Sequence, residues 1–168
     1  MSSGPAGLHL SEPDAPHAPH APHAPMRRPR FIIDHSAWQR VATEPVVRAA
    51  IEAIIRTTAP DDILICPPVA AEYGFSARSL EDHSAIVLTL AGAFSDCRMH
   101  PEVRDVAAIR SALFAAHMGR AAGAVDVLIA AYAVVNRATV VHYDRDFTHI
   151  ARAYPDLRQR WVVAEGSL

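Results

Sequence analysis

Short apolar runs alternate with longer amphipathic stretches along most of this chain. The runs 31–33 and 63–66 are uniformly apolar, 139–142 has two Val at its centre, and all three are too short for helices, as in strands that are buried on both faces. We expect two further short strands at 97–99 and 161–163. The stretches between the runs predict helices at 36–42, 45–58, 67–78, 80–94, 101–121, 126–136 and 147–154. This alternation is typical of an α/β sandwich built on a parallel sheet.

Residues 1–29 differ in composition from the rest of the chain. Seven of the 13 Pro lie in this segment, and His-Ala-Pro occurs three times in succession between His17 and Pro25. Pro at every third position favours extended, solvated backbone that cannot build a core. We therefore expect a disordered tail rich in Pro, His and Ala at 1–29 and one folded domain at 30–168. Because Met26 follows the repeat, residues 1–25 are either native or an extension ahead of a later start.

The composition excludes several kinds of chemistry. All 16 basic residues of the 168 are Arg, so P-loop, kinase and Schiff-base sites that need Lys are excluded. Gly-x-Gly never occurs, which removes the dinucleotide fingerprint. Cys66 and Cys97 make neither a zinc site nor a disulfide framework, and we expect two buried thiols. No apolar run is long enough to cross a membrane and no signal peptide is evident, so we expect a cytoplasmic protein.

Acidic residues follow the predicted strands at the sheet edge where ligands of parallel sheets bind. Asp34 ends the first strand, and Asp144 and Asp146 follow the strand at 139–142. Glu72 lies about one turn into the helix after the second strand, and Asp126 lies near the start of its helix. Each has an ordinary explanation as a helix cap, a turn residue or a solvated side chain. A carboxylate that closes a buried strand is nevertheless costly unless something pairs with it, so we expect these five to converge.

A divalent cation is the simplest counter-charge for such a cluster. Clustered carboxylates repel one another, and some stay protonated near neutral pH unless a cation intervenes. The chain offers no Lys for this purpose. Mg²⁺ prefers carboxylate and water oxygens, and one or two such ions activate water and stabilise the oxygens of a phosphodiester. Such an ion would balance the charges of the five acids if they converge: Asp34, Glu72, Asp126, Asp144 and Asp146.

Four segments, in order, resemble those of the PIN-domain ribonucleases, and most closely the VapC toxins of bacterial toxin–antitoxin pairs. They read FIIDHS at 31–36, PPVAAE at 67–72, VDVLIAAYA at 125–133 and VHYDRDF at 141–147. The likeness covers about residues 31–163, nearly the whole chain after the tail. It implies a PIN-like three-layer α/β/α sandwich with a short central parallel sheet.

The resemblance also implies an activity and a set of site residues. Carried over position by position, it makes the following the catalytic acids: Asp34, Glu72, Asp126 and Asp144. Asp146 is then a fifth metal-site residue, direct or through water, and Ser36 matches a hydroxyl that orients Asp34 or a metal-bound water. The implied enzyme is a Mg²⁺-dependent endoribonuclease toxin, with Mn²⁺ able to substitute, that cuts tRNA or rRNA loops and leaves a 5′-phosphate and a 3′-hydroxyl. The implied partners are a VapB-type antitoxin and a second copy in a homodimer.

The charge of the predicted domain agrees in part with an RNA substrate. Three of the 16 Arg and two of the 18 acidic residues precede position 31, so the domain keeps 13 Arg and 16 acids. Without the five clustered acids the remainder is mildly basic, as a polyanion binder needs. Arg120 and Arg145 flank the acidic segments and are the candidate phosphate contacts, with solvated or structural Arg as the alternative. For His117 and His142 a core or supporting role is favoured over that of a general base.

Two other functions stay open at this point. A non-catalytic PIN-fold interaction module would keep the fold without activity, although the four acidic positions are intact. A Mg²⁺-dependent phosphatase or phospho-receiver also gathers Asp around Mg²⁺ in an α/β fold. Phosphatases and phospho-receivers of this kind use a Lys at the site, and this chain has none. The phosphatase pattern also needs D-x-D after the first strand, whereas Asp34 is followed by His35 and Ser36.

Overall fold

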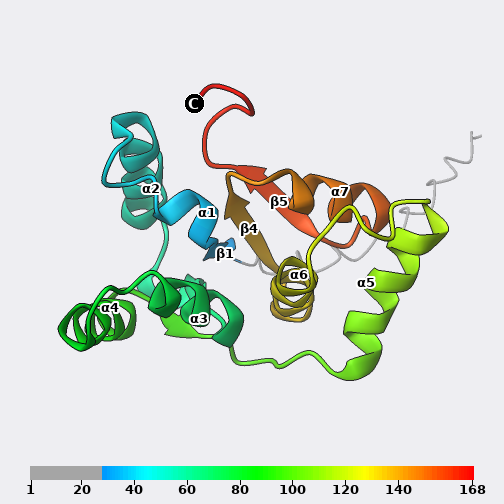
Figure 1. Cartoon of the computed structure of the whole chain (residues 1–168), viewed down its shortest axis with the longest axis horizontal. Helices are drawn as coiled ribbons and strands as arrows, with labels where there is room; N and C mark the ends of the chain where they lie inside the picture. Colours follow the sequence, from blue (N-terminus) through cyan, green and yellow to red (C-terminus); the bar gives the residue numbers. More distant parts are fainter. Residues whose placement is uncertain (1–27) are drawn as a thin grey trace, which may run out of the picture.

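A five-stranded parallel sheet forms the centre of the computed structural model, which describes residues 28–168 (Figure 1). The strand order is β3-β2-β1-β4-β5, and every neighbouring pair is parallel. The predicted short central parallel sheet is therefore confirmed. The strands are β1 (Arg30–Ile33), β2 (Ile63–Ile65), β3 (Ser95–Asp96), β4 (Ala138–His142) and β5 (Arg158–Trp161).

Helices connect the strands and cover both faces of the sheet. Figure 1 shows α2 on one side of the sheet and α6 on the other. The helices are α1 (His35–Trp38), α2 (Pro45–Thr57), the 3₁₀ turn η1 (Pro60–Asp62), α3 (Pro67–Phe75), α4 (Leu80–Ala93), α5 (Val103–Ala115), α6 (Ala124–Asn136) and α7 (Arg145–Ala153).

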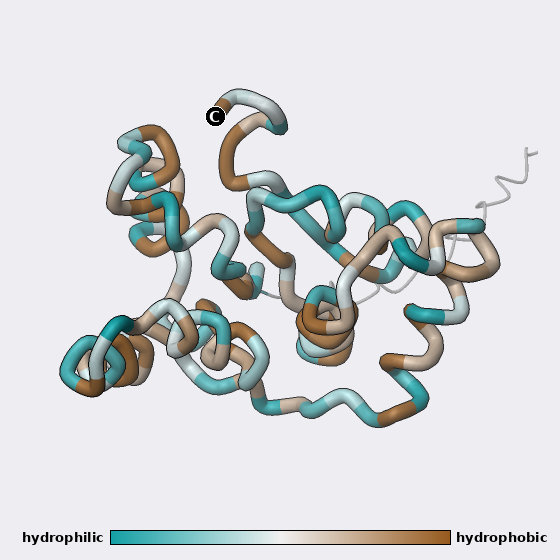
Figure 2. The backbone as a smooth tube through the Cα atoms, viewed as in Figure 1, coloured by the Kyte–Doolittle hydropathy of each residue, from teal (hydrophilic) through white to brown (hydrophobic). Residues whose placement is uncertain are grey.

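Successive strand residues point to opposite faces and so build two cores. Ile32 and Val140 pack into the core beneath α3, α5, α6 and α7. Their neighbours Ile33 and Val141 pack into the second core against α1 and α2. Figure 2 shows apolar colour around most of α6, which the sheet and the neighbouring helices bury. The predicted three-layer α/β/α sandwich is thus confirmed.

Two predicted strands lie a few residues earlier than the apolar pattern indicates. The strand expected at 97–99 is Ser95–Asp96, although the N–H of Cys97 still donates to the carbonyl oxygen of Ile65 at 2.9 Å. The strand expected at 161–163 is Arg158–Trp161. Both are edge strands, which have one free side and therefore carry polar residues that an apolar pattern does not detect.

The long helix predicted at 101–121 is shorter, spanning 103–115. It ends because His117 adopts a left-handed backbone with φ 57°, and the N–H of Met118 donates to the carbonyl oxygen of Leu113 at 2.8 Å. Arg110 then fixes the following loop, since its guanidinium donates to the carbonyl oxygens of Gly119 and Ala122 at 3.3 and 3.0 Å. This loop leads directly into α6.

The remaining expectations on organisation concern the termini and membranes. The predicted disorder of 1–29 falls on residues outside the described ones, apart from Arg28 and Pro29, which have no regular structure. Both Cys66 and Cys97 are buried free thiols, as expected. Across residues 28–168, no helix combines the length and the apolar character that a membrane span requires.

Candidate active site

Asp34 lies where β1 gives way to α1 and is almost fully buried, with 4% of its surface exposed. Its Oδ2 caps α1 by accepting a hydrogen bond from the N–H of Ser36 at 2.8 Å. Its Oδ1 is buried and has no hydrogen-bond partner among the described residues. Burial raises the pKa of Asp34, and the hydroxyl and N–H of Ser36 only partly oppose this. A buried carboxylate oxygen without a donor is a position that a cation would satisfy.

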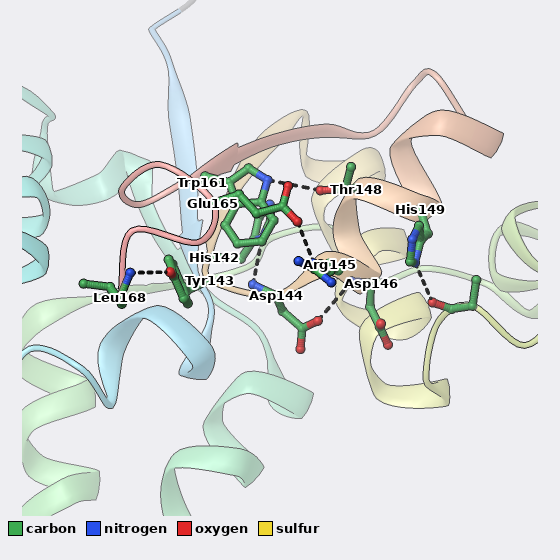
Figure 3. Close-up of polar contacts among 11 residues, drawn as sticks. His142, Tyr143, Asp144, Arg145, Asp146, Thr148, His149, Trp161, Glu165 and Leu168 are labelled. Atoms are coloured by element: carbon green, nitrogen blue, oxygen red, sulfur yellow. Dashed lines mark hydrogen bonds and ion pairs between the residues drawn. The ribbon is translucent and has the colours of Figure 1, made fainter.

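Asp144 occupies the equivalent position between β4 and α7. Its Oδ1 caps α7 by accepting from the N–H of Asp146 at 3.0 Å, and its own N–H donates to Nδ1 of His142 at 3.1 Å (Figure 3). Nε2 of His142 therefore carries the ring proton and donates to Oε1 of Gln159 at 2.6 Å. His142 is fully buried, and burial lowers its pKa. This neutral histidine supports the backbone of Asp144 from within the core, the role that sequence favours for it.

The two capping segments are tied to each other across the sheet edge. The N–H of Asp34 donates to the carbonyl oxygen of Val141 at 2.9 Å. The N–H of Tyr143 donates to Oγ of Ser36 at 3.0 Å. Sequence assigns the Ser36 hydroxyl to Asp34 or a bound water, and the structure adds that its oxygen also holds the chain just before Asp144.

Gly123 fixes the positions of two more carboxylates at the start of α6. Its N–H donates to Oδ2 of Asp146 at 3.0 Å, which joins the starts of α6 and α7. A Cβ at this position would stand 2.5 Å from Oδ2 of Asp126 and 3.9 Å from Oδ2 of Asp146. Sequence reasoning does not identify this role of Gly123, because a glycine before a helix signals only a break.

Glu72 completes the cluster from α3. Pro67 begins this helix, and Tyr73 anchors it by donating from its hydroxyl to the carbonyl oxygen of Ile33 at 3.2 Å. Burial is the largest cause that raises the pKa of Glu72 to about 7, followed by the charges of Asp34, Asp126 and Asp144. Glu72 therefore stands within electrostatic reach of three other predicted site residues.

Asp126 shows the same influence from its neighbours. Burial, the largest cause, and the charges of Asp146, Asp144 and Asp34 together raise its pKa to about 6. Each of the five acidic residues that sequence singles out therefore lies within electrostatic reach of at least one other. Without a cation, their like charges repel one another, and this edge of the sheet carries unbalanced negative charge.

This donor set fits a hard divalent cation. Its ligands are all carboxylate oxygens, the type that Mg²⁺ and Mn²⁺ prefer, and Asp34 Oδ1 has no other partner among the described residues. Within residues 28–168, no three Asp, Glu, His or Cys side chains already stand where they would hold one ion together. Ligation by three of them therefore requires side chains to turn toward the ion.

The two arginines expected to contact phosphate lie at the surface. Nε of Arg145 pairs with Oε1 of Glu165 at 2.6 Å, away from the carboxylates of Asp144 and Asp146 (Figure 3). Arg120 is exposed in the loop before α6. No Arg among the described residues forms an ion pair with the clustered acids. The phosphate contacts of Arg120 and Arg145 stay predictions.

Comparison with known proteins agrees with this arrangement. The family model described as "PIN domain" matches residues 31–153, which include all five clustered acids. The chain belongs to the PIN-domain family. Two relatives of this PIN domain come from Mycobacterium tuberculosis. "Ribonuclease VapC21" (strain CDC 1551 / Oshkosh) is 33% identical over 143 residues, covering 82% of this chain and 97% of its own. "Ribonuclease VapC18" (strain ATCC 25618 / H37Rv) is 29% identical over 148 residues, covering 82% of this chain and 98% of its own.

Solved structures support the PIN fold independently. The DNA-bound VapBC of Salmonella typhimurium contains a chain with a TM-score of 0.60 at 20% identity, covering 80% of this chain and 99% of that one. VapBC2 of Rickettsia felis, bound to a promoter DNA fragment, gives a TM-score of 0.58 at 15% identity, covering 77% and 96%. Because the sequence identities are low, these structures show only that the fold is shared.

Proposed function

We propose that this PIN domain is a divalent-metal-dependent endoribonuclease. The observation that carries the proposal is the gathering of carboxylates at one edge of the sheet: Asp34 and Asp144 cap the helices that follow β1 and β4, and Gly123 lies beside both Asp126 and Asp146. Such clustering raises the free energy of the folded protein, and it is found mainly at functional sites. The match to relatives named as ribonucleases supports RNA as the polymer.

In this proposal each acid has a role set by how firmly its element holds it. Asp34 and Asp144 are fixed by the caps of α1 and α7, so they define the centre of the site. Asp126 and Asp146 lie beside Gly123, and Glu72 on α3 is within electrostatic reach of Asp126. A divalent ion held there would supply an activated water and a Lewis acid for the scissile phosphate. Without the ion, Glu72 exchanges its proton near neutral pH.

The finer features follow from family resemblance. We propose Mg²⁺ as the ion, with Mn²⁺ able to substitute, and loops of tRNA or rRNA in the cytoplasm as the substrate. The products carry a 5′-phosphate and a 3′-hydroxyl. Arg120 and Arg145 are the proposed phosphate contacts, and the surface exposure of both side chains agrees with this role.

We further propose that a VapB-type antitoxin neutralises the enzyme and that the enzyme forms a homodimer. The solved neighbours described as VapBC support the antitoxin. A cavity of about 460 Å³ beside the site, lined by polar and apolar residues that include His35, Trp38 and Tyr73, would accept side chains of such a partner. Phe75 and Leu80 are 93% and 83% exposed on the adjoining helices, which supports coverage by another polypeptide.

RNA cleavage by a charge-removing variant tests the proposal. Asp34→Asn keeps an oxygen that caps α1 but removes the charge, so the protein stays folded and loses at least ~100-fold in cleavage rate. The matched control is Asp105→Asn, because the carboxylate of Asp105 accepts from the N–H of Glu102 at the start of α5, away from the cluster. EDTA abolishes wild-type cleavage, and excess Mg²⁺ restores it. Equal cleavage by wild type, Asp34→Asn and EDTA-treated protein would refute the proposal.

A further inference from the structure

A second cavity, of about 940 Å³, lies at the edge of the sheet opposite the acidic cluster. Arg30, Ala138 and Arg158, the first residues of β1, β4 and β5, line it. Asp34 and Asp144 follow the other ends of β1 and β4. Nothing in the proposed nuclease chemistry uses this cavity.

Arginines dominate the lining of this cavity. Five of the 16 Arg of the chain line it, together with three Asp, which leaves an excess of positive charge. Arg30 is already engaged, because its Nε pairs with Oδ1 of Asp62 at 3.3 Å. Within residues 28–168, the other four arginines form no ion pair. The charged residues are Arg28, Arg30, Arg98, Arg137 and Arg158, with Asp61, Asp62 and Asp156.

Local structure holds two of these arginines against the cavity. Arg137 ends α6 in the left-handed backbone region, with φ 55° and ψ 37°, which a residue such as Arg adopts rarely. The buried Asn136 beside it accepts from the N–H of Met99 at 3.0 Å and donates to the carbonyl oxygen of Met99 at 2.8 Å. These two bonds bring Arg98 to the end of α6. The left-handed backbone is the usual way for a helix to end, and here it places Arg137 at the rim of the cavity.

We propose that this cavity binds a nucleoside polyphosphate. Its volume falls within the usual range of small-ligand pockets. Arginine guanidinium groups bind phosphates through paired hydrogen bonds, and Asp61 and Asp156 are acceptors for ribose hydroxyls or base N–H groups. Val134 and Ala138 give the cavity an apolar side against which a base can pack.

The lining favours a small ligand over an RNA strand. A groove that follows a single strand combines basic residues with several aromatic side chains on which successive bases stack. The described lining of this cavity has no aromatic side chain, and its arginines and three Asp are gathered in one concavity. A nucleotide uses both charges, since its phosphates and its sugar lie at different ends.

Calorimetric titration of the full chain with ATP tests this inference. The solution contains EDTA, so that the acidic cluster holds no metal that could recruit the nucleotide. We expect saturable binding to wild type, and binding to Arg98→Gln/Arg158→Gln that is weaker by about tenfold or more. Arg137→Asn is a second, independent variant, because Asn tolerates the left-handed backbone. Arg104→Gln is the control, since Arg104 is 77% exposed on α5 and pairs only with Glu102 among the described residues.

Two further titrations show which parts of the ligand the cavity recognises. Inorganic triphosphate is expected to bind more weakly than ATP, because it lacks the sugar and base that Asp61, Asp156 and Val134 would contact. A single-stranded RNA oligonucleotide is expected to bind equally to wild type and to Arg98→Gln/Arg158→Gln. Absence of saturable ATP binding, unchanged ATP binding by the variants, or RNA binding that the variants abolish would each overturn the inference. None of these results depends on RNA cleavage, so the proposed nuclease stands or falls separately.

Discussion

Replacing Gly123 with alanine perturbs the acidic cluster without changing its charge. The backbone of Gly123, with φ −64° and ψ 165°, is one that alanine adopts without strain. The added Cβ would stand 2.5 Å from Oδ2 of Asp126, whereas ordinary van der Waals contact begins at 3.4 Å. The two distances differ by nearly 1 Å, so the Asp126 carboxylate must move by about that much.

A displacement of this size has a predictable effect on the rate. A reacting group misplaced by about 1 Å costs roughly 100-fold in rate, so we expect Gly123→Ala to lower kcat for RNA cleavage by about that factor. Stability changes little, because the weaker cap is offset by the lower entropy of the unfolded alanine chain, a net change within about 1 kcal/mol. The N–H that binds Asp146 is retained.

Initial cleavage rates at saturating Mg²⁺, with thermal unfolding of the same samples, measure both effects. The matched control is Gly92→Ala in α4, where an added Cβ meets nothing within 4 Å. In this helix alanine is favoured over glycine by about 1 kcal/mol, so the control is slightly stabilised and fully active. A folded Gly123→Ala protein whose cleavage rate equals that of wild type would refute the role given to the position of Asp126.

Three more predictions concern stability. Between about pH 4 and 7, Glu72 and Asp126 bind more protons in the folded protein than in the unfolded chain, because their pKa values are raised to about 7 and about 6, whereas the lowered pKa of His142 has the opposite effect. In EDTA, the Tm of wild type should therefore fall relative to that of Glu72→Gln/Asp126→Asn as pH rises through this window, modestly because solvent screens both groups; a constant or growing difference in favour of wild type contradicts this. Ser36→Ala leaves the N–H of Tyr143 without its acceptor and should lower the free energy of unfolding by about 1–3 kcal/mol in urea titration; an unchanged midpoint would count against the link. Phe147→Ala, at a fully buried position, should lower it by about 3–5 kcal/mol, and a loss below 1 kcal/mol would contradict its place in the core.

The parts of the fold that follow from sequence are those with local causes. β1, β2 and β4 lie inside the sheet, so each has a short apolar centre that indicates a strand directly. Asp34 and Asp144 stand out because each is a charged residue at or just after the end of such a strand. The edge strand β5 is missed in part because its free side allows arginine and glutamine in the strand.

Other features depend on contacts between distant segments and leave no local pattern. His142 accepts from the backbone of Asp144 while donating to Gln159 on another strand, and either bond alone is invisible in sequence. The end of α5 depends on the backbone of His117 and on the carbonyl groups that Arg110 gathers. The arginine-lined cavity is assembled from several separate segments, so no single stretch of sequence signals it.

The most direct test of the acidic cluster as a metal site is the anomalous difference density of a crystal soaked with Mn²⁺. The ion should be bonded to Oδ1 of Asp34, the buried carboxylate oxygen that has no other partner in the described part of the chain, and to at least one of Glu72, Asp126 and Asp144. The same soak of Asp105→Asn should give the same peak. A soaked crystal of an RNA-cleaving protein with no peak at these carboxylates, or with its ion held elsewhere, would contradict the account.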